Sequence, residues 1–171
     1  MGDWRELIRD IPDFPVPGVV FKDIAPVLAD APALTSMVGE FIEVCRPFRP
    51  DAVVAVEARG FLLGAPVALA LGVGLVPVRK PGKLPYLTRS VAYALEYGEA
   101  VLHMHLDALE PGARVLLVDD VLATGGTLEA AARLVRDADA VPVGAAVLLE
   151  IAALEGRTRL ADLPMRVLTT A

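Results

Sequence analysis

Residues 115–127 read VLLVDDVLATGGT, and this stretch decides the fold. Its apolar start is typical of a buried strand in a parallel sheet, and residues 128–135, which follow it, have the propensity and period of a helix. The strand is predicted over residues 114–119, the two acids Asp119 and Asp120 stand where it ends, and a Thr-Gly-Gly-Thr turn then leads into the helix. Because ligands of parallel sheets bind beyond the carboxyl ends of the strands, we expect the binding site here.

Further short apolar runs occupy residues 52–57, 75–78 and 143–149, and an apolar helix is predicted over about residues 61–71. Strands that alternate with helices in this way predict an α/β fold, with a mostly parallel twisted sheet flanked by helices. A length of 171 residues fits a single domain.

Two segments interrupt the alternation. Residues 11–18 read IPDFPVPG, and their three prolines favour an extended, ordered covering loop. Residues 79–98 form a long connection that starts with a basic stretch and has its own turn signals. Long connections inside small domains are more often functional than accidental, so we expect a mobile hairpin or lid.

Composition excludes several classes of protein. Residues 60–78 carry no charge, but Pro66, Pro77 and four glycines divide them into a buried helix and strand rather than a membrane span. A net charge of −6 argues against nucleic acid as a partner. The start of the chain lacks a signal-peptide pattern, and its single cysteine, Cys45, cannot form an internal disulfide. We expect a cytoplasmic protein.

The residues after the strand suit a sugar phosphate. A carboxylate at a strand end accepts hydrogen bonds from hydroxyl groups, while a glycine turn that opens a helix lets main-chain N–H groups approach a phosphate. The plainer alternative is a turn with solvated acids. Rival phosphate motifs do not occur, since no Gly-Lys-Ser/Thr follows a glycine loop and Gly72-Val73-Gly74 stands between helix and strand, the wrong order for a dinucleotide fingerprint.

Residues 115–127 resemble the diphosphoribosyl-binding motif of the type I phosphoribosyltransferases. Other stretches resemble the adenine-specific branch of that family nearly end to end: IPDFPVPGVVFKDI (11–24), EARGF (57–61), RKPGKLP (79–85), LEYG (95–98), and Glu150 with LEGR (154–157). The resemblance implies a hood over about residues 1–28 and a lid over about 79–98. It also implies a homodimer that joins adenine to 5-phosphoribosyl 1-diphosphate, giving AMP and pyrophosphate, with Mg²⁺ held mainly by the substrate and by no direct protein ligand.

The resemblance also implies roles for individual residues. The ribose hydroxyls would be bound, directly or through the metal, by Asp119 and Asp120. The 5′-phosphate would be bound by Ala123, Thr124, Gly125, Gly126 and Thr127. The diphosphate would meet Arg59, Arg79, Lys80 and Lys83, at least one of them from a partner subunit. Proton transfer on adenine would fall to Glu96, with Tyr97 beside it. Adenine would be selected by main-chain groups near Val20 and Lys22, with Phe21 as apolar cover.

Several alternatives remain open at this point. Arg59 could instead be a structural cation paired with Glu57. His103 stands where relatives carry Glu, and with His105 it shares one face of a predicted strand, which is a poor metal site with two ligands. Pro81 replaces a frequent second cation. A different purine base as substrate, or a nucleotide-sensing regulator on the same fold, is the alternative function.

Overall fold

The computed structural model describes residues 2–14, 16–94 and 98–171. The chain divides into two compact units, Met1–Glu40 and Phe41–Ala171. Helix α2 (Ala31–Cys45) runs from the first unit into the second. Among the described residues, no helix is both long and apolar enough to span a membrane.

The first unit contains a small hairpin and a helical turn. Strands β1 (Arg9–Pro12) and β2 (Val20–Asp23) pair antiparallel, after the 3-10 turn η1 (Trp4–Leu7) and before the short helix α1 (Ala25–Ala29). At the hairpin tip, the Asp13 carboxylate accepts a hydrogen bond from the Gly18 amide at 2.7 Å. The predicted covering loop at residues 11–18 thus overlaps the end of β1 and the described part of the connection to β2.

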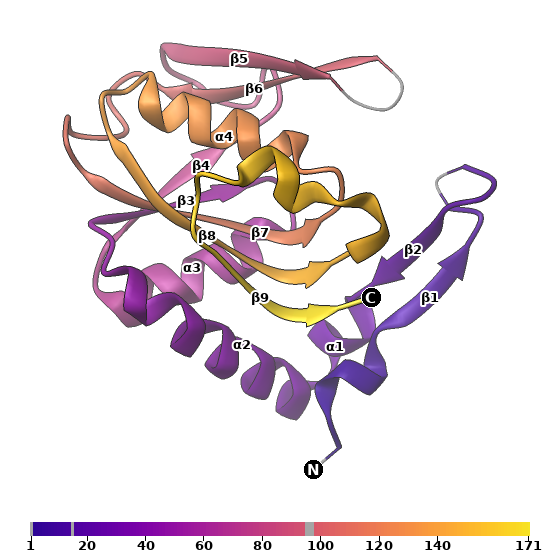
Figure 1. The fold of residues 1–171 in the computed structure, drawn as a ribbon. Coiled ribbons are helices and arrows are strands. Elements are labelled where there is room, and N and C mark those ends of the chain that lie inside the picture. Colours follow the sequence, from indigo (N-terminus) through magenta and orange to yellow (C-terminus); the bar gives the residue numbers. More distant parts are fainter. Residues whose placement is uncertain (1, 15, 95–97) are drawn as a thin grey trace. The chain divides into compact units, whose positions relative to one another are not determined.

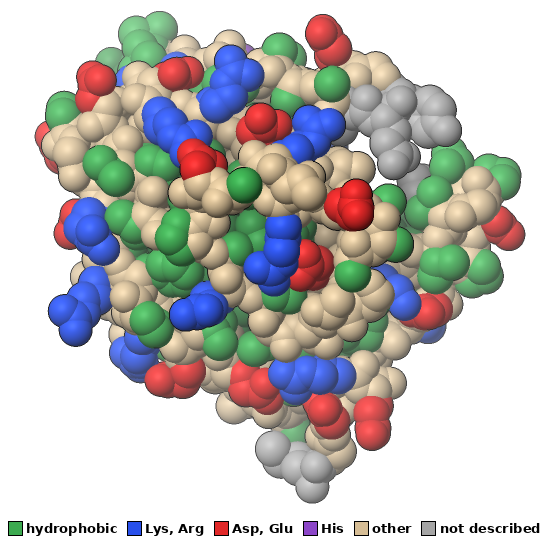
Figure 2. Space-filling view, viewed as in Figure 1, with side chains coloured by type: hydrophobic (Ala, Val, Ile, Leu, Met, Phe, Trp, Pro, Cys, Tyr) green, Lys and Arg blue, Asp and Glu red, His purple; other side chains and the backbone are tan. Residues whose placement is uncertain are grey.

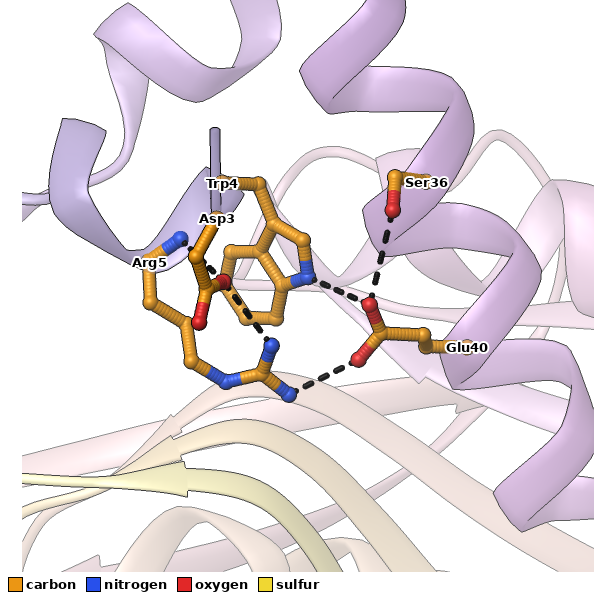
Figure 3. Close-up of polar contacts among 5 residues, drawn as sticks. All are labelled: Asp3, Trp4, Arg5, Ser36 and Glu40. Atoms are coloured by element: carbon orange, nitrogen blue, oxygen red, sulfur yellow. Dashed lines mark hydrogen bonds and ion pairs between the residues drawn. The ribbon is translucent and has the colours of Figure 1, made fainter. Parts of the chain in front are cut away.

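A polar cluster fixes the start of the chain to helix α2 (Figure 3). The Trp4 indole, only 2% exposed, donates to one Glu40 oxygen at 2.9 Å, and the Arg5 guanidinium donates to the other at 2.8 Å. Arg5 also bonds Asp3, and its guanidinium lies over the Trp4 ring. The hydrogen bond from Arg5 lowers the pKa of Glu40, so this cluster keeps its charges at neutral pH.

A five-stranded parallel sheet in the order β4-β3-β7-β8-β9 forms the centre of the second unit. Its strands are β3 (Ala52–Val56), β4 (Gly74–Val78), β7 (Arg114–Leu122), β8 (Val141–Glu150) and β9 (Met165–Thr170). Helices α3 (Gly60–Leu71) and α4 (Gly126–Arg136) lie on opposite faces of the sheet (Figure 1). The predicted α/β fold, with its apolar strands and both helices, is confirmed.

The hydrophobic core lies between the sheet and α4. Leu128, Leu134 and Val135 on one side of that helix pack with sheet residues such as Val54 and Leu117. A second layer covers the helix from outside, because β5 (Thr88–Ala94) and β6 (Glu99–His105) form an antiparallel pair beside α4 (Figure 1). The pair starts nine residues after Arg79, so the basic stretch precedes the strands rather than forming one of them.

Short 3-10 turns complete the second unit. They are η2 (Arg46–Phe48), η3 (Ala152–Leu154) and η4 (Gly156–Leu160). The last two connect β8 to β9, the strand at the sheet edge, for which the sequence analysis made no prediction. On the face shown in Figure 2, acidic and basic side chains are interspersed without a broad patch of one sign.

Candidate active site

Two buried acids stand near the carboxyl end of β7. Asp119 and Asp120 are each 7% exposed, and Asp119 Oδ1 accepts the Asp120 amide at 2.9 Å. Burial raises the pKa of Asp119 well above its usual range, and the adjacent negative charge of Asp120 raises it further. Arg59, which forms an ion pair with Asp120, partly opposes this shift. Such a costly pair of carboxylates is typical of a site for hydroxyl groups or cations.

The turn after these acids leads directly into helix α4. Gly125 adopts the left-handed conformation, with φ of 84°, and α4 begins at the next residue. Amide groups of the first helical turn point out of the helix end, and the helix dipole favours an anion there. A small pocket at this turn is lined by Val121, Leu122, Ala123, Thr124, Gly125, Thr127 and Leu128. The five residues predicted for a phosphate thus lie at one helix start.

Basic residues lie at the end of β4 and just after it. Arg79 Nε binds Glu57 Oε2 at 2.7 Å, and an Arg79 terminal nitrogen donates to the Lys83 carbonyl at 3.2 Å. Lys80 and Lys83 are exposed. Arg59 follows the neighbouring strand β3. Because β3 pairs in parallel with β4 and β7, these cations lie at the same carboxyl end of the sheet as the acids.

The ion pair between Arg59 and Asp120 was not foreseen. Sequence reasoning considered Glu57 as the partner of Arg59, but the Glu57 carboxylate is bound by Arg79. The Arg59 guanidinium is instead within ion-pair distance of the buried acid pair. The pairing of β3 with β7 explains this contact, because it brings the residues after Val56 beside the end of β7.

The end of strand β5 lies against the start of α4. It is therefore next to the turn at residues 123–125, which is predicted to bind a phosphate and is called the phosphate-type turn below. The Tyr93 ring and the Ala94 carbonyl occupy the space beside Gly126, and the Thr127 hydroxyl donates to the Tyr93 hydroxyl at 3.5 Å. Sequence reasoning did not single out Tyr93, and its only signal was its position just before the LEYG stretch. The predicted catalytic Glu96 and its neighbour Tyr97 lie outside the described residues.

The three residues predicted for adenine belong to the first unit. Val20, Phe21 and Lys22 are consecutive on β2. The Phe21 ring meets Phe14 edge to face, with 5.2 Å between ring centroids, while the Lys22 ammonium binds Asp10 at 2.8 Å. The Lys22 side chain is thus paired within the hairpin.

The histidines and the cysteine contribute no metal cluster. The described part of the chain contains no group of three or more His, Cys, Asp and Glu side chains placed to hold a metal ion. His103 Nδ1 lies 2.9 Å from the Thr88 hydroxyl, and His105 meets Tyr86 edge to face. Burial raises the pKa of the Cys45 thiol to about 12, which removes it as a nucleophile at neutral pH.

Comparison with known proteins shows the family to which this chain belongs. A family model described as phosphoribosyl transferase domain matches residues 30–169. The chain therefore belongs to the phosphoribosyltransferase family, and it is a pentosyltransferase enzyme.

Individual relatives narrow the class. The adenine phosphoribosyltransferase of Nocardioides sp. is 55% identical over 96% of this chain and 91% of that protein, and the one from Thermobifida fusca is 53% identical over 95% and 93%. A crystal structure of adenine phosphoribosyltransferase from Thermoanaerobacter pseudethanolicus superimposes with a TM-score of 0.95, at 47% identity, over 98% of this chain and 97% of that chain. The chain falls in the adenine-specific branch of the family, and its sheet has the type I fold.

Proposed function

We propose that this enzyme transfers the phosphoribosyl group of 5-phosphoribosyl 1-diphosphate to adenine, forming AMP and releasing pyrophosphate. The observation that carries the proposal is the buried acid pair beside a glycine turn at a helix start, on a chain of this family. The Saccharomyces cerevisiae relative, 35% identical with a TM-score of 0.89, was crystallised with adenine and an imino-altritol bisphosphate, which supports the choice of base.

In this proposal the acids and the turn hold the ribose 5-phosphate part of the substrate. Amides of Ala123 to Thr127 and the threonine hydroxyls donate to the 5′-phosphate, and the dipole of α4 adds to the attraction. Asp119 and Asp120 would accept hydrogen bonds from the ribose hydroxyls, or bind those hydroxyls through a metal ion that coordinates the hydroxyl oxygens. Holding the sugar at both ends orients the anomeric carbon for attack, so positioning supplies much of the rate.

The cations act on the leaving group. Breaking the bond to the diphosphate builds positive charge on the sugar and negative charge on the departing oxygens. Arg59, Arg79, Lys80 and Lys83 would neutralise that negative charge. The bonds from Arg79 to Glu57 and to the Lys83 carbonyl support this role, because they hold part of the basic stretch in place without neutralising the exposed lysines.

The acid pair also fits a divalent cation. Mg²⁺ prefers oxygen ligands and is usually bound by one or two carboxylates together with substrate phosphates. Burial raises the pKa of Asp119, the adjacent charge of Asp120 raises it further, and a divalent charge there would relieve that repulsion. Mg²⁺, carried mainly by the substrate, would neutralise diphosphate charge, while the two carboxylates orient the metal–ribose unit.

Base recognition and proton transfer complete the proposal. Main-chain groups near Val20 and Lys22 would read the adenine edge, and Phe21 would cover its face. Glu96 would exchange a proton with the purine, beside Tyr97. A glutamine at position 96 keeps the size but cannot transfer the proton, so we expect Glu96→Gln to lower kcat by about 10²-fold with little change in KM. Equal kcat values for the two proteins would remove Glu96 from the mechanism.

We also propose that the chain forms a single functional domain and that the enzyme is a homodimer. Helix α3 contains no charged residue, and its Leu62 and Leu69 side chains are 51% and 84% exposed. Exposed apolar surface of this kind marks association, and a second copy of the chain is the occupant that the family resemblance implies. Leu69→Glu should yield a monomer in analytical ultracentrifugation; a dimer of unchanged affinity would exclude α3 from the interface.

The activity is tested by pyrophosphate release from 5-phosphoribosyl 1-diphosphate and Mg²⁺ with adenine, guanine, hypoxanthine or xanthine. We expect turnover with adenine and little with the three oxopurines. Preference for an oxopurine would overturn the choice of base. No turnover with any of the four would overturn the proposed reaction.

A further inference from the structure

The stretch Leu154-Glu155-Gly156-Arg157, which matches the family, has no role in the proposal so far. It spans the end of η3 and the start of η4, on the connection from β8 to β9. Gly156 is buried although both of its neighbours are exposed. Glu155 turns the chain at this point, with a left-handed φ of 50°. The residue that faces inward is therefore the one without a side chain.

Gly156 lies directly against the phosphate-type turn. A Cβ atom at position 156 would fall far inside contact distance of the Ala123 carbonyl oxygen, and 3.0 Å from the Gly125 amide nitrogen. In the other direction, a Cβ at Gly125 would overlap the Gly156 carbonyl. The two backbones therefore touch, and each glycine makes room for the other. Backbone atoms cannot move aside as the end of a flexible side chain can.

The connection that carries Gly156 is itself held in place. Arg157 Nε donates to both oxygens of Glu150, at 2.7 and 2.9 Å, and the Glu150 residue is only 8% exposed. The Ile151 amide donates to the Leu122 carbonyl at 2.9 Å, immediately before the turn. Both bonds tie the connection to β7 and β8, so Gly156 meets the turn from a fixed position.

We propose that Gly156 is a positioning residue for the 5′-phosphate, because it forms the surface against which the turn 123–125 packs. This inference rests on the proposed function, since it assumes that the turn binds a phosphate. Phosphate binding by several main-chain amides depends on their common direction. A methyl group added at position 156 would push the turn outward and change the direction of all these amides at once. Gly156 thus acts on the substrate through Ala123 and Gly125.

Gly156→Ala is the direct test, because φ at this position suits alanine and only the space is lost. A shift of about 1 Å can cost up to about 10²-fold, so we expect KM for 5-phosphoribosyl 1-diphosphate to rise by at least about tenfold. KM for adenine should change by less than about twofold, since the base is bound elsewhere. A wild-type KM for 5-phosphoribosyl 1-diphosphate in the variant would overturn the inference.

Two control variants separate positioning from loss of stability. At Gly74 a Cβ meets nothing within 4 Å, so Gly74→Ala should match wild type. At Gly144, on β8, a Cβ would overlap the Phe48 ring, so Gly144→Ala should lower Tm and leave KM unchanged. If Gly144→Ala raises KM as much as Gly156→Ala does at the same loss of Tm, the effect is one of stability and the inference fails.

A milder variant keeps the test decisive if Gly156→Ala does not fold. Arg157→Lys retains the charge but loses the guanidinium contact to both Glu150 oxygens, which loosens the connection without adding atoms. We expect KM for 5-phosphoribosyl 1-diphosphate to rise by about threefold with kcat preserved. An unchanged KM would overturn the inference.

Calorimetric titration with ribose 5-phosphate distinguishes this inference from the proposed function. Wild-type protein that binds ribose 5-phosphate but turns over no purine would contradict the reaction alone. Weaker binding by Gly156→Ala than by Gly74→Ala would then still support the role of Gly156. Equal dissociation constants for the two variants would overturn that role, whatever the activity.

Discussion

The phosphate-type turn (residues 123–125) and the basic stretch (residues 79–83) differ in the contacts that hold them in place. The turn at residues 123–125 follows two buried acids, is packed against Gly156, and leads into a helix whose apolar side faces the core. In the basic stretch Lys80 and Lys83 are exposed. Arg79, at its start, is held by the ion pair with Glu57, the bond to the Lys83 carbonyl and two backbone hydrogen bonds with His103. With the roles proposed above, the sugar phosphate would meet a packed, preformed turn, whereas the diphosphate would meet exposed lysines beside an anchored Arg79.

The largest expected effect belongs to the packed turn. Gly125→Ala forces alanine into a left-handed conformation and overlaps the Gly156 carbonyl, so we expect kcat/KM to fall by at least about 10²-fold. Gly112→Ala is a matched control, because Gly112 has a similar φ of 80° but open space around its Cβ position. Steady-state kinetics and thermal unfolding of both variants separate strain from function. Equal losses of kcat/KM in the two variants would show that the turn at residues 123–125 is no more sensitive than another left-handed glycine position.

The acid pair is expected to lower the stability of the protein while it supports activity. Asp119→Asn removes a buried carboxyl group whose charged form is disfavoured by burial and by the charge of Asp120, so we expect a higher Tm at neutral pH and a fall in kcat/KM of about 10²-fold. Between the usual and the raised pKa, the folded protein holds a proton that the unfolded chain has lost, so unfolding free energy falls as pH rises through that interval. The Asp119→Asn variant should lose this pH dependence. Asp162→Asn, an exposed control, should change neither quantity; a lower Tm for Asp119→Asn would contradict the account.

A smaller effect is expected in the basic stretch. Lys83→Ala removes one exposed charge, so KM for 5-phosphoribosyl 1-diphosphate should rise by about fivefold at low salt and by less at high salt, where charges are screened. Arg166→Ala, which removes an exposed cation from β9, should leave KM unchanged. Kinetics at several salt concentrations test this. A salt-independent loss would indicate that Lys83 is part of a rigid site.

The smallest effect is expected where hairpin and turn meet. Tyr93→Phe removes only a long hydrogen bond from Thr127, so we expect KM for 5-phosphoribosyl 1-diphosphate to change by about twofold. Tyr86→Phe, which alters an exposed tyrosine beside His105, is the matched control. Comparison of the two KM values is the measurement. A loss above about tenfold would make Tyr93 a direct ligand rather than a neighbour of the turn.

The sequence predicts the centre of the fold well because its signals there are local. A buried apolar strand, a glycine turn and a helix follow one another at residues 114–136 and were confirmed as β7 and α4. The strand continues to Leu122, three residues beyond the predicted end, so Asp119 and Asp120 both lie within it. Strand β9 gave no such signal, since it is a half-exposed edge strand with two threonines. The hairpin β5–β6 was placed too early, because the basic stretch and the strand pair read as one connection.

Contacts between distant residues escaped prediction for a different reason. Arg59 meets Asp120, Gly125 meets Gly156, and the Trp4 indole binds the carboxylate of Glu40. Each contact joins segments far apart in the sequence, so it depends on the order and register of strands and helices that no local pattern encodes. The residues expected to bind phosphate could be named from the motif, whereas the residue that supports them could not.

Separate titrations of ribose 5-phosphate and of Mg²⁺–pyrophosphate test the division between the packed turn and the basic stretch most directly. The proteins compared are wild type, Gly125→Ala and Lys83→Ala. We predict that Gly125→Ala loses ribose 5-phosphate but retains pyrophosphate, and that Lys83→Ala does the reverse with a smaller, salt-sensitive loss. Equal weakening of both ligands in both variants would contradict the account.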